Sequence, residues 1–197
     1  MRLPGLCGVS LVFDGRLWAG AWVKKTDAID FDAFSSPNQP ALAVYEGGRW
    51  RQEGLPAATG RLHLGLVLAE DAQVATYVLT PGVNSDYMAR QWRQERPQAV
   101  ILLSYGNGNA PSHASFIQAV QAYVAQGGVL VNVSQVNRGL VAPIYAQGSA
   151  LAQAGALAGG RLTLEAAWAK LWVGISMGFA GPELSRWFAS DVLGEWG

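Results

Sequence analysis

The stretch AVILLSYGNGNAPS, from Ala99 to Ser112, indicates how the chain folds. Residues 99–105 form an apolar run, which is typical of a strand buried on both faces of a parallel sheet. The turn after this run contains two glycines and two asparagines, and doubly wound folds bind ligands at the carboxyl ends of their strands. The turn is therefore a candidate site, although these residues also suit an ordinary strand-to-helix turn.

The regions on either side of this stretch repeat the same alternation of strand and helix. Apolar runs predict strands, and apolar residues at steps of three and four predict amphipathic helices. Thr163 is a suitable N-cap for the last of these helices, whose aromatic stripe we expect in the core. The predicted strands cover 74–79 and 129–133, and the predicted helices cover 85–94, 112–125 and 163–175. Alternation of this kind predicts a parallel sheet covered by helices on both faces.

The first forty residues have a different pattern. Two apolar runs, Val9 to Phe13 and Arg16 to Trp22, flank Asp14-Gly15, a dipeptide that tolerates a tight hairpin turn. The proline-containing text of residues 24–40 predicts a loop. We expect the fold class α/β: the end of an N-terminal α/β domain followed by a smaller doubly wound parallel-sheet C-terminal domain. The expected bounds are 1–42, an irregular linker at 43–60 with room for short strands, and 61–197.

Composition limits the classes of function. Only 14% of residues are charged, against about 25% in an average soluble domain, so we expect much of the surface to be covered by a partner subunit or by further sequence. Fourteen basic and fourteen acidic residues cancel without a basic stripe, which argues against binding nucleic acid. No apolar run reaches about 18 residues, so no membrane span is expected. We also expect no signal peptide, and the single cysteine, Cys7, agrees with a reducing compartment.

Few side chains outside the turn suggest chemistry. Lys24 and Lys25 stand just before three aspartates, where a lysine could relay protons, although a solvated charge cluster is the alternative. Thr26-Asp27 pairs a hydroxyl with a carboxylate, but neighbouring side chains on an extended segment point to opposite faces. The two histidines, His63 and His113, are isolated in sequence, so we expect surface positions and no metal site.

Four blocks together resemble the L-asparaginases of the cytoplasmic type in order and spacing. They are KKTDAIDFDAFSSPN from Lys24, AVILLSYGNGNAPS from Ala99, VLVNVSQVNRGLV from Val129, and YAQGSALAQAGALAGGRLTLEAAWAKL from Tyr145. In that family a lysine just before the Phe-x-x-Phe-x-Ser-Pro-Asn stretch completes a proton relay, and the resemblance assigns this role to Lys25, with Lys24 the adjacent alternative. It also implies that Asn109 reaches into the active site of the neighbouring subunit.

The resemblance implies hydrolysis of L-asparagine to L-aspartate and ammonia through a threonine acyl-enzyme, with no cofactor. It further implies a homo-oligomer, a dimer that could pair into a tetramer, in the cytoplasm. The family has two catalytic threonines in an N-terminal domain, one in a Thr-Gly-Gly-Thr stretch and one in a Thr-Asp pair, and neither motif is matched in its place here. We therefore expect this chain alone to be inactive, as the C-terminal portion of such an enzyme.

Two other interpretations stay open. The chain could be a non-catalytic module that retains ligand binding and dimerisation. It could also belong to the asparaginase-like subunit of a tRNA-dependent amidotransferase, although such subunits carry extra domains that are not seen here. The sequence does not decide between asparagine and glutamine as the preferred substrate.

Overall fold

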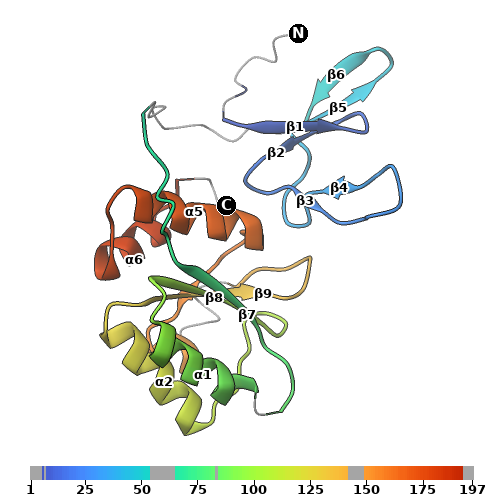
Figure 1. The fold of residues 1–197 in the computed structure, drawn as a ribbon. Coiled ribbons are helices and arrows are strands. Elements are labelled where there is room, and N and C mark those ends of the chain that lie inside the picture. Colours follow the sequence, from blue (N-terminus) through green and yellow to red (C-terminus); the bar gives the residue numbers. More distant parts are fainter. Residues whose placement is uncertain (1–5, 7, 54–64, 83, 142–148, 193–197) are drawn as a thin grey trace.

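The chain folds into two units that lie one above the other (Figure 1). The computed structural model describes residues 6, 8–53, 65–82, 84–141 and 149–192. The first unit consists of antiparallel strands and the second of a parallel sheet with helices. Among the described helices, none combines the length and the apolar character needed to cross a bilayer.

A four-stranded antiparallel sheet forms most of the N-terminal unit. Its order is β1 (Ser10–Phe13), β2 (Arg16–Ala19), β5 (Ala43–Glu46) and β6 (Arg49–Gln52). Asp14 and Gly15 both adopt positive φ, 45° and 65°, which confirms the predicted hairpin turn between the first two strands. One face of the sheet buries a small apolar cluster around Leu17, Trp22 and Leu42.

One expectation for this unit is wrong. Residues 24–40 were predicted to be loop, but β3 (Lys24–Lys25) and β4 (Phe34–Ser35) pair as a small antiparallel ribbon. The expected linker at 43–60 left room for short strands, and its first part contains β5 and β6, joined at Gly47 and Gly48, which both have positive φ. The glycine pair makes the tight turn possible, and the sheet with β2 holds it in place. Residues 54–64 lie outside the described part, so the domain bounds stay a prediction.

The C-terminal unit contains the predicted parallel sheet. Its strand order is β10 (Leu157–Ala158), β9 (Val129–Ser134), β8 (Ala99–Ser104) and β7 (Val74–Val78), and every neighbouring pair is parallel. Strand β10 was not predicted, because two residues that pair only with β9 leave no periodic pattern. The helices are α1 (Asn84–Glu95), α2 (Ala114–Ala125), α4 (Ala150–Gln153), α5 (Leu164–Ser176) and α6 (Gly181–Ala189).

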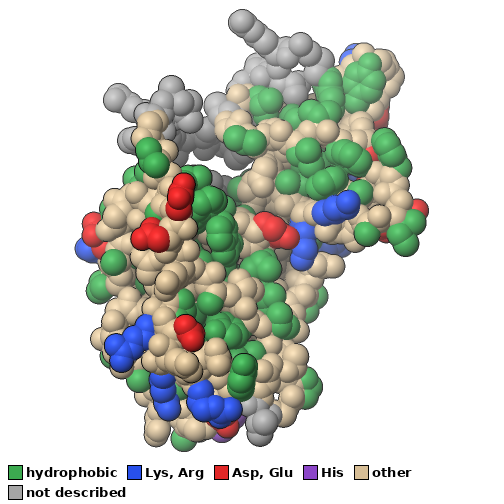
Figure 2. Space-filling view, in the orientation of Figure 1, with side chains coloured by type: hydrophobic (Ala, Val, Ile, Leu, Met, Phe, Trp, Pro, Cys, Tyr) green, Lys and Arg blue, Asp and Glu red, His purple; other side chains and the backbone are tan. Residues whose placement is uncertain are grey.

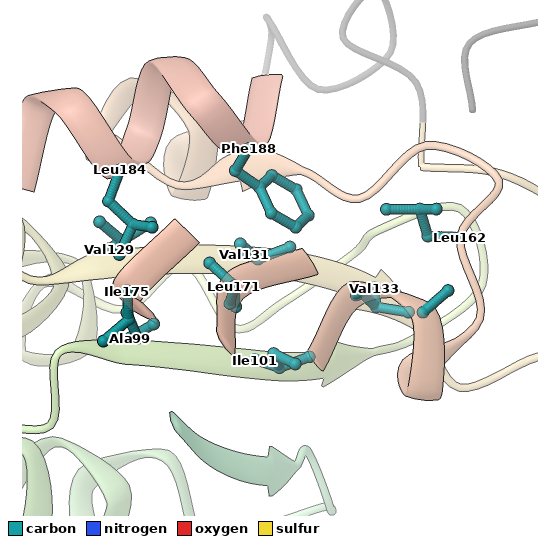
Figure 3. Close-up of a cluster of buried hydrophobic side chains, with 12 residues drawn as sticks. Ala99, Ile101, Val129, Val131, Val133, Leu162, Leu171, Ile175, Leu184 and Phe188 are labelled. Atoms are coloured by element: carbon teal, nitrogen blue, oxygen red, sulfur yellow. The ribbon is translucent and has the colours of Figure 1, made fainter. Parts of the chain in front are cut away.

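The two faces of this sheet pack on different helices, as expected for a doubly wound arrangement. Alternate residues of β8 and β9, such as Ile101 and Val131, face Leu171 of α5 and Phe188 of α6 (Figure 3). The intervening residues, such as Val100, face α1 and α2 on the other side. Complete burial of a side chain of this size contributes about 1.5–3 kcal/mol. The central strands are therefore the rigid base on which the loops at their carboxyl ends stand.

Helix α5 begins as predicted, since the Thr163 hydroxyl accepts a hydrogen bond from the Ala166 amide at 3.2 Å. Its aromatic stripe is only partly core. Trp168 and Trp172 are half-buried, and their indole N–H groups donate to the carbonyls of Val74 and Ala69, respectively. The two indoles thus hold the chain that enters the sheet against this helix.

A set of long-range hydrogen bonds joins the units. The Asn38 side chain accepts from the Gly139 amide at 2.8 Å and donates to the Arg161 carbonyl at 3.2 Å. The Arg138 guanidinium donates to the Pro37 carbonyl at 3.3 Å. The segment after β4 therefore rests against the loop after β9, which extends toward the N-terminal unit in Figure 1.

Candidate active site

The turn after β8 is tight, as its two glycines predicted. Tyr105 and Asn109 pair across it through two backbone hydrogen bonds of 2.8 and 2.9 Å. Gly106 and Gly108 both have positive φ, 48° and 109°. A Cβ at Gly108 would lie only 2.8 Å from a methyl group of Val141, so this position has no room for a side chain. The tight turn leaves the Asn109 side chain exposed at the carboxyl end of the strand.

Strand β9 holds this turn through two side chains that sequence reasoning missed. The Asn132 amide donates to the Gly108 carbonyl at 2.9 Å, and the Ser134 hydroxyl donates to the Gly106 carbonyl at 2.6 Å. The signal was present in the sequence, because Asn132 interrupts an otherwise apolar strand and a buried amide needs a partner. These bonds fix the backbone from which Asn109 projects.

The two lysines of β3 point in different directions. The Lys24 ammonium donates to the side-chain oxygen of Asn137 at 3.3 Å and so faces the C-terminal unit. Lys25 follows it on the same strand, pairs with Phe34 and is exposed. Successive side chains on a strand alternate between faces, which explains the difference. Lys24 is therefore already engaged by the loop after β9, whereas Lys25 is open to further groups.

As expected, Thr26 and Asp27 do not form a catalytic pair. The Thr26 hydroxyl lies 3.0 Å from that of Ser35 across the β3–β4 ribbon. The Asp27 carboxylate accepts from the amides of Ile29 and Asp30 at 2.7 and 3.0 Å, and these bonds hold its pKa below the usual range. The carboxylate is used to shape the turn, which leaves the hydroxyl without a base.

His113 is exposed at the start of α2, as predicted, but it is not isolated. Its Nε2 lies 3.1 Å from the Ser85 hydroxyl and 3.4 Å from the Asp86 carboxylate. Ser85 is 1% exposed, so no substrate can reach it, and both partners meet the same ring nitrogen. A nucleophilic pair needs a reachable hydroxyl and an orienting group on the other nitrogen, so the arrangement is structural. His63 and Cys7 lie outside the described residues.

The predicted site residues come from different units. Lys25 belongs to the ribbon of the first unit and Asn109 to the second, and no hydrogen bond between described residues joins them. A small cavity of about 60 Å³ lies between the units and is lined by Lys24, Asn38 and Ser134 among others. A space of that size holds a few water molecules. In the described part of the chain, no group of three His, Cys, Asp or Glu residues could hold a metal ion.

Comparisons with known proteins agree with this architecture. A family model of the glutaminase/asparaginase C-terminal domain matches residues 73–188, more than half of the chain, and one of the N-terminal asparaginase domain matches residues 4–55. L-asparaginase 1 of Escherichia coli K12 is 34% identical over 192 residues, which covers 95% of this chain and 55% of that protein. The 60 kDa lysophospholipase of Mus musculus is 32% identical over 98% of this chain but only 34% of its own length.

A solved structure shows the same fold. The crystal structure of L-asparaginase I from Vibrio cholerae matches with a TM-score of 0.83 and 28% identity, over 95% of this chain and 56% of that one. The chain thus spans about half the length of the asparaginases it matches. Both family models and the shared fold lead to one conclusion: this chain belongs to the glutaminase/asparaginase family.

Proposed function

We propose that this chain forms part of an L-asparagine amidohydrolase, in which Lys25 belongs to the proton relay. The observation that carries the proposal is the match to L-asparaginase 1 of Escherichia coli over 95% of the chain. The sequence contains no Thr-Gly-Gly-Thr stretch. The attacking hydroxyl would therefore come from polypeptide outside these 197 residues.

The reaction we propose proceeds through an ester. A threonine Oγ attacks the side-chain amide carbon of asparagine, the C–N bond breaks and ammonia leaves, and water then cleaves the ester to give aspartate. A hydroxyl is a weak nucleophile until a base removes its proton. Lys25 is exposed, so a covering domain could bring such a hydroxyl into contact with its amine.

The geometry supports Lys25 over Lys24. Lys24 is half-buried and already donates to Asn137, so it is part of the contact between the two units. Lys25 projects from the other face of the same short strand and is free of that contact. A group that must meet a nucleophile from outside these residues has to be on the open face.

We further propose that Asn109 serves the active site of a second subunit in a homo-oligomer. Its side chain is exposed, while the backbone that carries it is fixed by Asn132 and Ser134. A rigid, outward-facing amide is well placed to donate to a carboxylate on a neighbouring chain. We place this assembly in the cytoplasm, in line with the resemblance to the cytoplasmic type.

Two other functions compete with this one. A module that only binds ligand and dimerises would have the same fold, but Lys25 would take no part in proton transfer. The lysophospholipase relatives raise a further activity, but that match leaves two thirds of the relative uncovered. No feature of the described residues favours either over amide hydrolysis.

The test is a fusion protein. The part of Escherichia coli L-asparaginase 1 that the match leaves uncovered is joined to this chain. Ammonia release is measured with L-asparagine and L-glutamine, and fatty-acid release is measured with a phospholipid. We expect activity on L-asparagine from the fusion and none from the chain alone. Ammonia release by the purified chain alone, or a folded fusion that cleaves only phospholipid, would refute the proposal.

Mixed oligomers test whether Asn109 acts across subunits. Fusions carrying Lys25→Met and Asn109→Ala should each be inactive alone. Mixed in equal amounts, they should regain about a quarter of the activity, because about half of the dimers are then mixed and one of the two sites of each mixed dimer combines an intact Lys25 with an intact Asn109. If Asn109 serves its own subunit, mixing will restore nothing.

A further inference from the structure

The second face of the antiparallel sheet in the N-terminal unit carries a row of charged side chains. Arg16, Val44 and Arg51 lie directly opposite one another on β2, β5 and β6, so they share one face. Trp18 is two residues beyond Arg16 and lies on the same face. The apolar cluster around Leu17 occupies the opposite face, so these charges are not part of the core.

This face forms the floor of an open cavity of about 580 Å³. The segment Ser36–Ala41 and Arg138, on the loop after β9, line it from the side. That volume lies within the range of small-molecule sites, about 300–1,000 Å³. The cavity is thus shared by both units, and it lies apart from Lys25 and Asn109, neither of which lines it.

The charges in the cavity do not cancel. Both lining carboxylates, Glu46 and Glu53, pair with Arg51, at 3.6 and 2.8 Å. Within the described part of the chain, no carboxylate pairs with Arg16 or Arg138. Two guanidinium groups are therefore left facing the cavity region without an anion to neutralise them.

Both of these arginines are held in place. The Arg16 guanidinium lies over the Trp18 ring, 5.7 Å from its centroid, and Trp18 itself is 5% exposed. Arg138 donates to the Pro37 carbonyl at 3.3 Å, which leaves its other N–H groups available. Guanidinium groups that are held in this way lose little entropy when they bind an oxyanion.

A neutral hydrogen-bond donor lines the cavity together with the two arginines. Ser36 lines the cavity, and its buried hydroxyl has no hydrogen-bond partner among the described residues. A buried polar group without a partner costs stability, so such a group calls for an explanation. A bound oxygen within reach of this hydroxyl would satisfy it.

We propose that this cavity binds a small anionic molecule through a carboxylate or phosphate group, with Arg16 and Arg138 as its main ligands. Arginine forks match the two oxygens of either group. The binding site is separate from the proposed active site, so its test does not depend on the proposed reaction.

Isothermal titration calorimetry of the full chain tests the proposal, with succinate and inorganic phosphate as probes and neutral succinamide as the control. We expect saturable binding of at least one of the two anions and none of succinamide. Binding of succinate alone identifies a carboxylate ligand, and binding of phosphate alone identifies a phosphate ligand. No saturable binding of either anion overturns the proposal.

Charge variants locate the site. Arg16→Gln and Arg138→Gln should each weaken binding about tenfold or more, since a hydrogen bond to a charged group is lost. Arg93→Gln, which removes the same charge from the exposed side of α1, should change it less than about twofold. Glu53→Gln should tighten binding a few-fold, because it frees Arg51.

Arg138 also helps to join the units, so circular dichroism must show that its variant is folded. Among the described residues, Arg16 makes no hydrogen bond between the units, so the result for Arg16→Gln decides the test. If Arg16→Gln binds the anion as tightly as the unchanged chain, or if Arg93→Gln weakens binding equally, the cavity is not the site.

Discussion

The side-chain oxygen of Asn38 accepts a hydrogen bond from the Gly139 amide at 2.8 Å, across 101 residues of sequence. The other atom of the same amide group donates to the Arg161 carbonyl. One side chain thus binds two separate backbone segments of the C-terminal unit. We consider it the main polar connection between the two units.

Asn38→Ala should lower the free energy of unfolding by about 1–3 kcal/mol, because two hydrogen bonds are lost. Asn38→Asp keeps the acceptor and should lose less. Urea unfolding followed by circular dichroism gives the difference, with Asn107→Ala, an exposed asparagine in the turn, as the control. Equal stability of Asn38→Ala and the unchanged chain would contradict the role we give to this side chain.

Gly108→Ala should destabilise the chain by about 2 kcal/mol or more. The substitution combines a positive φ of 109° with a Cβ placed 2.8 Å from Val141, and neither can be relieved without moving the turn. Gly106→Ala has nothing closer than 3.8 Å and should cost about half as much. The comparison is made by thermal unfolding, and a reversed order of the two variants would show that the turn is not packed as described.

Thr163→Ala should cost about 1 kcal/mol, since the hydroxyl that caps α5 is lost. Thr163→Ser keeps the hydroxyl and should stay within a few tenths of a kcal/mol of the unchanged chain. Urea denaturation measures both. A serine variant as unstable as the alanine variant would mean that the methyl group, rather than the cap, matters at this position.

Lys170 gives a prediction about pH. It is 3% exposed, its ammonium donates to the Ser190 carbonyl at 2.6 Å, and burial lowers its pKa from 10.5 to about 8. The nearby carboxylate of Asp191 acts in the opposite direction and raises this pKa. Between pH 8 and 10.5 the unfolded chain holds this proton and the folded chain does not, so stability should rise with pH across that window.

The size of this rise can be measured against Lys170→Met, whose unbranched side chain is one atom shorter and cannot titrate. Relative to that variant, the unchanged chain should gain about 2–3 kcal/mol in its free energy of unfolding from pH 8 to 10.5. Denaturant unfolding at several pH values gives the difference. If the difference between the two proteins does not change with pH, the folded-state pKa of Lys170 is not lowered.

The fold could be predicted where each element carries its own pattern. Strand β8 and the helices α1, α2 and α5 could be predicted because the spacing of their apolar residues and their lengths are typical of a buried strand and of helices that cover a sheet. Strands β5 and β6 were weakly indicated, yet the Gly47-Gly48 pair between two β-rich runs was the usual hairpin signal. The β3–β4 ribbon has two residues in each strand, so no periodicity could reveal it.

The candidate site was predictable only in part. The turn before Asn109 follows from local glycine chemistry, and the structure places it at the carboxyl end of β8 as expected. The contacts of Asn38 and Lys24 span more than 100 residues and depend on how the units pack. Sequence spacing contains no information about such packing, which is why these contacts were missed.

The surface exposes many apolar side chains, in agreement with the low fraction of charged residues in the sequence. Apolar side chains gather over the N-terminal unit in the view of Figure 2, and several large ones are strongly exposed, among them Val9, Ile29 and Phe31 at 84%, 94% and 76%. An exposed apolar surface on this scale is typical of an interface. It agrees with the proposal that further polypeptide packs on this unit and brings a nucleophile to Lys25.

Ammonia release from L-asparagine by the fusion protein, compared between Lys25→Met and Lys24→Met, tests the central claim most directly. Both variants remove one positive charge and shorten the side chain by one atom, so they differ in which face of β3 they alter. We predict that Lys25→Met lowers the rate at least about a hundredfold, as expected for the loss of a proton-transfer group, while Lys24→Met stays within about tenfold. An active fusion in which Lys25→Met is as fast as the unchanged protein would contradict the account.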